Sequence, residues 1–149
     1  MSSITMSPSV SQESRAVNWG AFARVGVATV VTAVIANVLV YFVGRAIVTY
    51  DPEFVVLSNV SGAVIFTLLS AIGAVLVYAA LLRFSRNPAR VFIIISAVVF
   101  VVTLIPDFTY IPTVPGASDG QTTILVLMHV AAAIVIVRML TTLTRPQSR

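Results

Sequence analysis

Residues 26–48 read GVATVVTAVIANVLVYFVGRAIV, and this stretch decides the fold class. It is apolar almost throughout, with one strongly polar residue near its centre, Asn37, and one charge near its end, Arg45. A helix crosses the ~30 Å hydrocarbon core of a bilayer with about 20 residues, so this stretch is long enough for a transmembrane helix. Three more stretches of the same kind follow, at residues 62–82, 89–105 and 122–140. The sequence therefore predicts an all-α fold, a transmembrane four-helix bundle.

The composition indicates lipid as the solvent and excludes several kinds of chemistry. Of the 149 residues, 58% are hydrophobic and only 9% are charged, and the mean hydropathy is +1.04. A soluble domain is about a quarter charged, so this chain could not cover its surface with polar groups in water. The absence of cysteine excludes disulfides, thiol redox chemistry and iron–sulfur clusters. The absence of lysine excludes cofactors that form a Schiff base, and no other cofactor is expected.

The basic residues predict the orientation of the chain in the membrane. Eight of the nine arginines fall on one side of the four spans: Arg15, Arg24, Arg83, Arg86, Arg90, Arg138, Arg145 and Arg149. Only Arg45 lies near the other side. The positive-inside rule makes the arginine-rich side cytoplasmic, so both termini are expected in the cytoplasm. A net charge of +4 would suggest nucleic acid in a soluble protein, but orientation and anionic lipid headgroups explain these arginines better, and no nucleic-acid partner is expected.

The chain divides into one transmembrane domain and two tails. Residues 1–18 are rich in serine and predict a disordered cytoplasmic tail. Residues 19–143 contain the four spans, and residues 144–149 form a second cytoplasmic tail.

The connections between the spans also carry helix signals. Asn87 and Pro88 predict a helix start at the third span. Asp51 and Pro52 give the same signal earlier and predict a short interfacial helix over residues 52–57, which breaks near residues 58–62. After the third span come Pro106, Pro112, Pro115 and Gly116. Because such a run does not continue a regular helix, the third span is expected to end at residue 105.

Polar side chains inside the spans gather in the outer half and form the candidate site. They are Asn37, Arg45, Thr67, Thr103, Asp107 and His129. A polar residue inside a membrane is costly, so each of them is a functional hypothesis. Their depths are compatible with one shared cluster. No catalytic residue, cofactor-binding residue or metal ligand set is predicted.

Each of the charged or titratable members has two interpretations. His129, the only histidine, is either a proton-linked or ligand-binding group paired with Asp107, or a neutral imidazole that hydrogen-bonds Asn37, a threonine or a backbone carbonyl across the bundle. Asp107 either caps a local turn or pairs with Arg45, or acts as an acid, base or cation ligand. Arg45 either reaches the outer headgroups or forms a salt bridge or anion site. For Asn37 the prediction is a hydrogen bond that holds two helices together.

Two short motifs carry a resemblance to a known family. Residues 86–90 read RNPAR at the turn into the third span, and residues 127–132 read LMHVAA in the fourth. Over about residues 23–143 the chain resembles a family of small four-span membrane proteins of bacteria and archaea that is catalogued as a domain of unknown function. The resemblance implies a four-helix membrane domain with a histidine in its last span, and it implies no reaction. With the arginine pattern, we expect a multi-pass protein of a prokaryotic plasma membrane.

These observations predict a non-enzymatic integral membrane protein that binds a lipid, a small apolar ligand or a partner helix through its outer half. Membrane lipid is the expected partner, and a second copy of the chain or another membrane protein stays open. The alternative is a small transporter or channel subunit that acts as an oligomer. The size resembles that of small multidrug exporters, but those rely on a glutamate in the first span, where this chain has Asn37. An enzyme is not expected, because no serine lies in a nucleophile motif and His129 with Asp107 supplies too few metal ligands.

Overall fold

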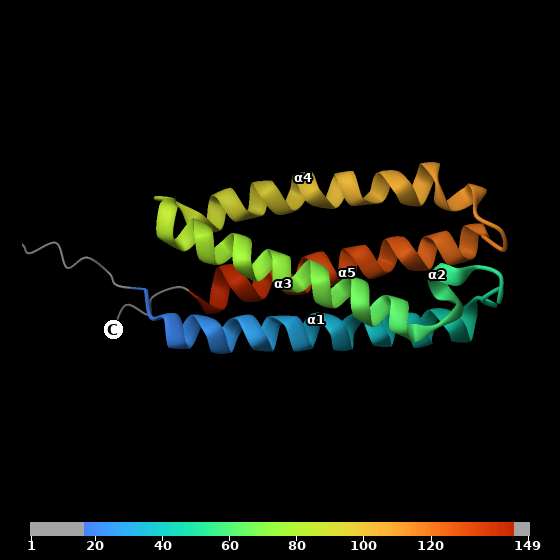
Figure 1. Ribbon diagram of the computed structural model, residues 1–149, viewed down its shortest axis with the longest axis horizontal. Helices are drawn as coiled ribbons and strands as arrows, with labels where there is room; N and C mark the ends of the chain where they lie inside the picture. The colour runs from blue at the N-terminus through green and yellow to red at the C-terminus, as the bar shows by residue number, and fades with distance from the viewer. Residues whose placement is uncertain (1–16, 145–149) are drawn as a thin grey trace, which may run out of the picture.

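The computed structural model describes residues 17–144, which form four long helices and two short ones. In chain order they are α1 (Trp19–Ile47), α2 (Val55–Ser58), α3 (Val60–Phe84), α4 (Pro88–Thr109), the 3-10 helix η1 (Ile111–Thr113) and α5 (Asp119–Leu143). Residues 17–144 contain no strand. The long helices run side by side along the long axis of the molecule (Figure 1). Each of the four is long and apolar enough to cross a membrane, which confirms the predicted all-α class and the four spans.

The two ends of this bundle are built differently, and we name them by what lies there. At the terminal end, α1 begins, α5 finishes and a tight turn joins α3 to α4 (Figure 1). At the capped end, the segment 48–59 with α2 and the segment 110–118 with η1 lie over the helix ends (Figure 1). Arg24, Arg83, Arg86 and Arg90 lie at or near the terminal end, with Arg138 in the second half of α5. Arg45 is the one described arginine at the capped end, as the sequence predicts.

Three of the long helices begin at a side-chain cap. Asn18 accepts a hydrogen bond from the backbone N–H of Ala21 at 3.0 Å, and Asn59 accepts one from Ser61 at 3.0 Å. The hydroxyl of Ser118 accepts from the N–H of Gln121 at 3.3 Å. Each cap satisfies one N–H that a helix start leaves without an intrahelical partner. α4 begins instead with Pro88 at its first position, where the missing N–H costs nothing.

The segment between α1 and α3 contains a short helix, which begins later than predicted. Residues 52–53 form a turn, and α2 follows at Val55–Ser58, where the prediction was residues 52–57. Asn59 is extended, with φ −137° and ψ 139°, and separates α2 from α3. The start is delayed because the Asp51 carboxylate accepts from the N–H of Glu53 at 2.8 Å, which holds the chain in a turn.

The predicted helix end at residue 105 is wrong. α4 continues through Pro106 to Thr109, and only then does the chain pass into η1. A proline removes one N–H, but its fixed φ is helical, and its carbonyl still accepts from the N–H of Tyr110 at 2.9 Å. Asp107 is therefore a helical residue inside the bundle, whereas the sequence placed it in the turn that ends the span.

Two apolar clusters fill the interior, one towards each end. The cluster at the terminal end consists of Phe22, Ala33, Ala71, Tyr78, Phe92, Ile136 and Leu140. The cluster at the capped end consists of Tyr41, Phe54, Leu57, Ala63, Ile111, Ile124, Leu125 and Met128. Large apolar side chains are exposed along the outward faces of all four long helices, as expected for surfaces in contact with lipid. α1 packs mainly on α5 and α3, whereas α4 packs mainly on α5.

The predicted tails fall mostly on residues whose placement is not described. Residues 1–16 and 145–149 lie outside the described residues, and with them Arg15, Arg145 and Arg149.

Candidate functional site

The six predicted polar residues separate into three contacts and one isolated side chain. Asn37 bonds Thr67, Asp107 faces His129, and Arg45 bonds Tyr41. Thr103 is exposed on α4, and its hydroxyl donates to the carbonyl of Phe100 in the same helix at 2.8 Å. The structure thus brings four of the six together in two pairs that join neighbouring helices, and it leaves Thr103 outside both.

Asn37 and Thr67 link α1 to α3 in the buried interior. The amide Nδ2 of Asn37 donates to Thr67 Oγ1 at 2.7 Å, and this hydroxyl donates to the carbonyl of Ala63 at 2.6 Å. The amide oxygen of Asn37 has no hydrogen-bond partner within residues 17–144. The contact agrees with the predicted role of Asn37 as a bond between helices.

Asp107 and His129 form a polar contact between α4 and α5. His129 Nδ1 lies 3.3 Å from Asp107 Oδ2 and 2.9 Å from the carbonyl oxygen of Leu125. A carbonyl oxygen only accepts, so Nδ1 carries a proton. That N–H is hydrogen-bonded to the carbonyl of its own helix, and Asp107 Oδ2, although 3.3 Å from Nδ1, is buried without a hydrogen-bond partner within residues 17–144. Among the described residues this is the only contact between a basic and an acidic side chain within 4.0 Å.

These contacts show which of the pairings considered for Asp107 and His129 are present. Asp107 pairs with His129 and not with Arg45. The backbone bond of His129 goes to Leu125 one turn earlier, and not to a carbonyl across the bundle.

Arg45 lies beside a small polar hollow at the capped end. The hollow has a volume of about 210 Å³ and is lined by Tyr41, Phe42, Arg45, Ser58, Asn59 and Val60. It therefore lies between the last turns of α1 and the break that separates α2 from α3. In the part of the chain that the structure describes, no acidic side chain lies within 4.0 Å of the Arg45 guanidinium.

Tyr41 holds the wall of this hollow in place. Its hydroxyl accepts from Arg45 Nη1 at 3.3 Å and donates to the carbonyl of Leu57 at 3.2 Å. Tyr50 in turn donates its hydroxyl to the carbonyl of Tyr41 at 2.9 Å. Burial raises the pKa of Tyr50 above its ordinary value, the neighbouring Tyr41 raises it further, and Arg45 opposes both. The hydrogen bond to Tyr41 holds one side of the Arg45 guanidinium, and the rest of the side chain lines the hollow.

Gln121 organises the capped end, and sequence reasoning missed it. Its side chain is 1% exposed. The amide oxygen accepts from the N–H of Asp51 at 3.0 Å, and the amide nitrogen donates to the carbonyl of Gly116 at 2.7 Å and to Ser118 Oγ at 3.2 Å. Gln121 stands three residues after the cap Ser118, which is the spacing of a capping box. That spacing signals a helix start in the sequence, but it gives no indication of the bonds to Asp51 and Gly116.

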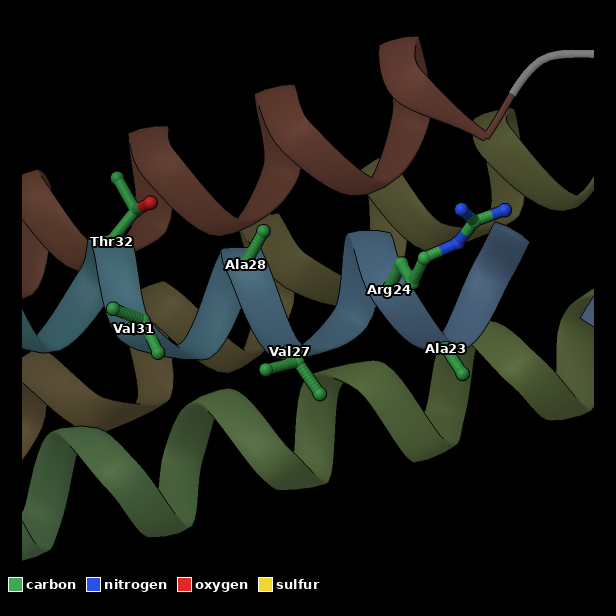
Figure 2. Close-up of a pocket in the computed structure, with 6 residues that line it drawn as sticks. All are labelled: Ala23, Arg24, Val27, Ala28, Val31 and Thr32. Atoms are coloured by element: carbon green, nitrogen blue, oxygen red, sulfur yellow. The ribbon is translucent and has the colours of Figure 1, made fainter. Parts of the chain in front are cut away.

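A larger hollow lies elsewhere, and its lining contains none of the six predicted residues. It is a shallow depression of about 550 Å³ over α1, near the terminal end, lined by Ala23, Arg24, Val27, Ala28, Val31 and Thr32. Figure 2 shows Thr32, Ala28 and Arg24 along one edge of this face, with Val31, Val27 and Ala23 along the other. The small Ala28 between larger side chains accounts for the depression. Its lining is apolar apart from Arg24 and Thr32, like the other exposed faces of the long helices.

Metal binding finds no support in the described residues. Nowhere in residues 17–144 do three or more His, Asp or Glu side chains gather in a way that could hold a metal ion.

The model of a protein family of unknown function, DUF6069, matches residues 17–146, which is nearly the whole chain. The chain belongs to this family. The matched range contains all four membrane-length helices and every residue of the candidate site, so the predicted resemblance to a family of unknown function is confirmed. No curated protein and no solved structure matches the chain.

Proposed function

We propose that this member of the DUF6069 family is a non-enzymatic integral membrane protein that binds a lipid with an anionic headgroup at the capped end of its bundle. The hollow beside Arg45 is the observation that carries the proposal. Of the three ligand classes that the sequence leaves open, it favours the lipid over a small apolar ligand or a partner helix, because its lining combines a cation with exposed apolar surface.

The chemistry of the hollow fits a phosphate group. A guanidinium has five N–H donors, and only one contact of Arg45, to Tyr41, occupies them within the described chain. Phosphate oxygens accept such donors in pairs, through charge-assisted hydrogen bonds. On the opposite wall, the Ser58 hydroxyl already donates to the carbonyl of Val55 at 3.0 Å and the Asn59 amide oxygen caps α3, so the amide nitrogen of Asn59 is the donor left for a phosphate. Phe42 lines the same hollow and is 55% exposed, so an acyl chain has apolar surface to follow.

The same proposal assigns the capped end to the outside of a prokaryotic plasma membrane, with both termini in the cytoplasm. Its support is the arginine distribution, with Arg45 alone at the capped end. A single cysteine tests the orientation directly, because the chain has none of its own. We expect Arg86→Cys to react with an impermeant thiol reagent only after cells are permeabilised. Labelling of intact cells would contradict the orientation.

Lipid binding is tested on delipidated protein by native mass spectrometry. We expect dioleoyl-phosphatidylglycerol to be retained over dioleoyl-phosphatidylcholine. Arg45→Gln should lower the retention roughly tenfold, because a hydrogen bond to a charged group contributes about 1.5–3 kcal/mol. Arg24→Gln is the matched control, since it removes an exposed arginine of the same helix at the other end. Equal retention of the two lipids, or equal losses in the two variants, would contradict the proposal.

A second candidate function is a small transporter or channel subunit that acts as an oligomer. The observation that favours it is the Asp107–His129 pair, because ionisable side chains inside membrane helices often lie on ion or proton pathways. Proton flux into vesicles that contain the purified protein tests this. A flux above that of protein-free vesicles, and lost in Asp107→Asn, would support transport, and flux equal to that of the empty vesicles would exclude proton transport.

A further inference from the structure

α4 is the least embedded of the four long helices, and its anchors differ in kind. Of the most apolar 18-residue stretch of this span, only 11% is buried, against 28% for the same length of α1 and of α5. Its buried residues are just two, Phe92 and Asp107. Phe92 lies at the terminal end, against Tyr78, with ring centroids 4.9 Å apart. Asp107 lies at the other end, against His129. One end of α4 is therefore held by an aromatic contact, and the other by an ionisable side chain.

The protons of this pair can be counted from its contacts. Nδ1 of His129 keeps its proton because it faces the Leu125 carbonyl. With that proton in place, the pair is electrically neutral when it holds one more, either on His129 Nε2 or on a carboxyl oxygen of Asp107. Loss of this proton leaves a net negative charge between two membrane helices, and gain of another leaves a net positive charge. Both states are costly where the surroundings have a low dielectric constant.

No other charged group compensates for a change in this proton count. α3 has no charged or titratable residue before Tyr78, and η1 has none. The remaining titratable groups on or next to the other helices, none of them in an ion pair with Asp107 or His129, are Arg24, Tyr41, Arg45, Arg90, Tyr110, Asp119 and Arg138. Tyr41 and Arg45 are bonded to each other, and the other five are exposed residues.

The exposure of the two side chains shows where a proton can enter. Asp107 is 7% exposed, whereas the His129 side chain is 35% exposed. The imidazole thus lies between the surface of the bundle and the buried carboxyl. Nε2 makes no hydrogen bond within residues 17–144. His129 is therefore the more accessible of the two groups to a proton from outside.

We propose that Asp107 and His129 form a proton-binding site, and that the proton it holds keeps the capped end of α4 docked on α5. The neutral pair is the docked state. When the pair loses its proton at high pH or takes up a second one at low pH, the charge left behind is solvated by releasing the end of α4, while Phe92 keeps the terminal end in place. This site is separate from the lipid hollow, and neither proposal depends on the other.

Two spin labels measure the docking in the full chain, held in lipid nanodiscs. Thr109→Cys and Thr123→Cys place one label on each helix at the capped end, and both positions are exposed. Ile93→Cys and Leu143→Cys form the control pair at the terminal end. We expect the capped-end distance to lengthen at both low and high pH, on either side of the middle range in which the pair holds its one extra proton. The ratio of released to docked molecules should change by up to about tenfold per pH unit, the limit for one proton. The terminal pair should not respond.

Two variants separate a proton site from a merely structural contact. In Asp107→Asn the side chain keeps its size and an acceptor oxygen for Nδ1, but the carboxyl proton is gone, so the pH response at high pH should disappear. His129→Gln is the second variant, in case the first does not fold, and it should remove the response at low pH. Asp119→Asn removes an exposed acid of α5 and should leave the response intact. A capped-end distance that does not depend on pH would overturn the proposal, and so would a high-pH response that persists in Asp107→Asn or a low-pH response that persists in His129→Gln.

Discussion

Each end of this bundle has its own buried apolar cluster, and the capped end adds hydrogen bonds that hold its loops. At the terminal end, Tyr78 lies between Phe22 and Phe92, with ring centroids 6.3 and 4.9 Å away. At the capped end, the loops are held by hydrogen bonds, above all those of Gln121 and Tyr41. Aromatic packing needs only shape, whereas buried backbone groups must each find a partner when no water is present. The capped end is therefore the more specific construction of the two.

This difference also explains why the candidate functions fall at the capped end. A hydrogen-bonded cap brings donors and acceptors into the membrane-length part of the protein. Some of these groups have hydrogen-bonding atoms without a partner in the described chain. Examples are the guanidinium of Arg45 beside its hollow and the carboxyl of Asp107 beside His129. The terminal end offers aromatic rings and exposed arginines, which anchor a protein at an interface but give no enclosed polar site.

The largest effect is expected from loss of an aromatic ring at the terminal end. Phe92 is 2% exposed and is one of the two buried residues of α4. Phe92→Ala should lower the free energy of unfolding by about 4 kcal/mol, because the cavity forfeits the contacts of a whole ring. Unfolding in mixed micelles measures this. Phe84→Ala, at an 80% exposed ring of the same end, should change it by less than about 0.5 kcal/mol. Equal losses would show that the aromatic cluster does not hold this end.

The next largest loss in the free energy of unfolding is expected from a change in the backbone of the capped end. Gly116 has φ +74°, and an added Cβ would lie 2.8 Å from the backbone nitrogen of Phe54 and 3.0 Å from Asp51 Oδ1. Gly116→Ala should cost about 3 kcal/mol, through backbone strain and this clash. Gly73→Ala is the matched control, because nothing lies within 4 Å of its Cβ, and it should stabilise α3 by up to about 1 kcal/mol. If Gly116→Ala left the free energy of unfolding unchanged, the loops of the capped end could shift to accept the added Cβ. The capped end would then not be the more specific construction.

The sequence predicts the helices well because each needs only a local signal. An apolar run of about 20 residues and a helix-start signal such as Asn87 followed by Pro88 define a membrane helix without reference to the rest of the chain. The prediction was wrong at Pro106, where a local rule for helix ends lost to the helical φ of proline.

The contacts of the candidate site were harder to predict than the residues themselves. Asp107 and His129 were both singled out, and their pairing was one of the alternatives, because their depths agree. Sequence does not show which faces converge, so Thr103 was grouped with residues that it does not touch. Gln121 was missed because its role depends on Asp51, 70 positions away. Loop-to-helix contacts of that kind follow from the tertiary fold alone.

The hydrogen bonds of Gln121 provide the third test. Gln121→Ala leaves the N–H of Asp51 and the carbonyl of Gly116 without partners, which should cost about 2 kcal/mol. Hydrogen exchange should accelerate over residues 48–59 and stay unchanged at the terminal end. Thr123→Ala is the control, since this exposed hydroxyl bonds only its own helix. Protection that is unaltered over residues 48–59 would show that Gln121 does not hold the cap.

The smallest free-energy change is expected in the middle of the bundle, at the hydrogen bond between Asn37 and Thr67. A double-mutant cycle with Asn37→Leu and Thr67→Val should give a coupling of about 0.6 kcal/mol, the average for hydrogen bonds between membrane helices. Asn37→Leu alone should cost little, because it also removes an amide oxygen that is buried without a partner. A coupling well above about 1.7 kcal/mol would exceed what such bonds contribute in membrane bundles. The amide would then be part of a polar network that extends from the capped end towards the middle of the bundle, and the boundary between the two ends would have to move with it.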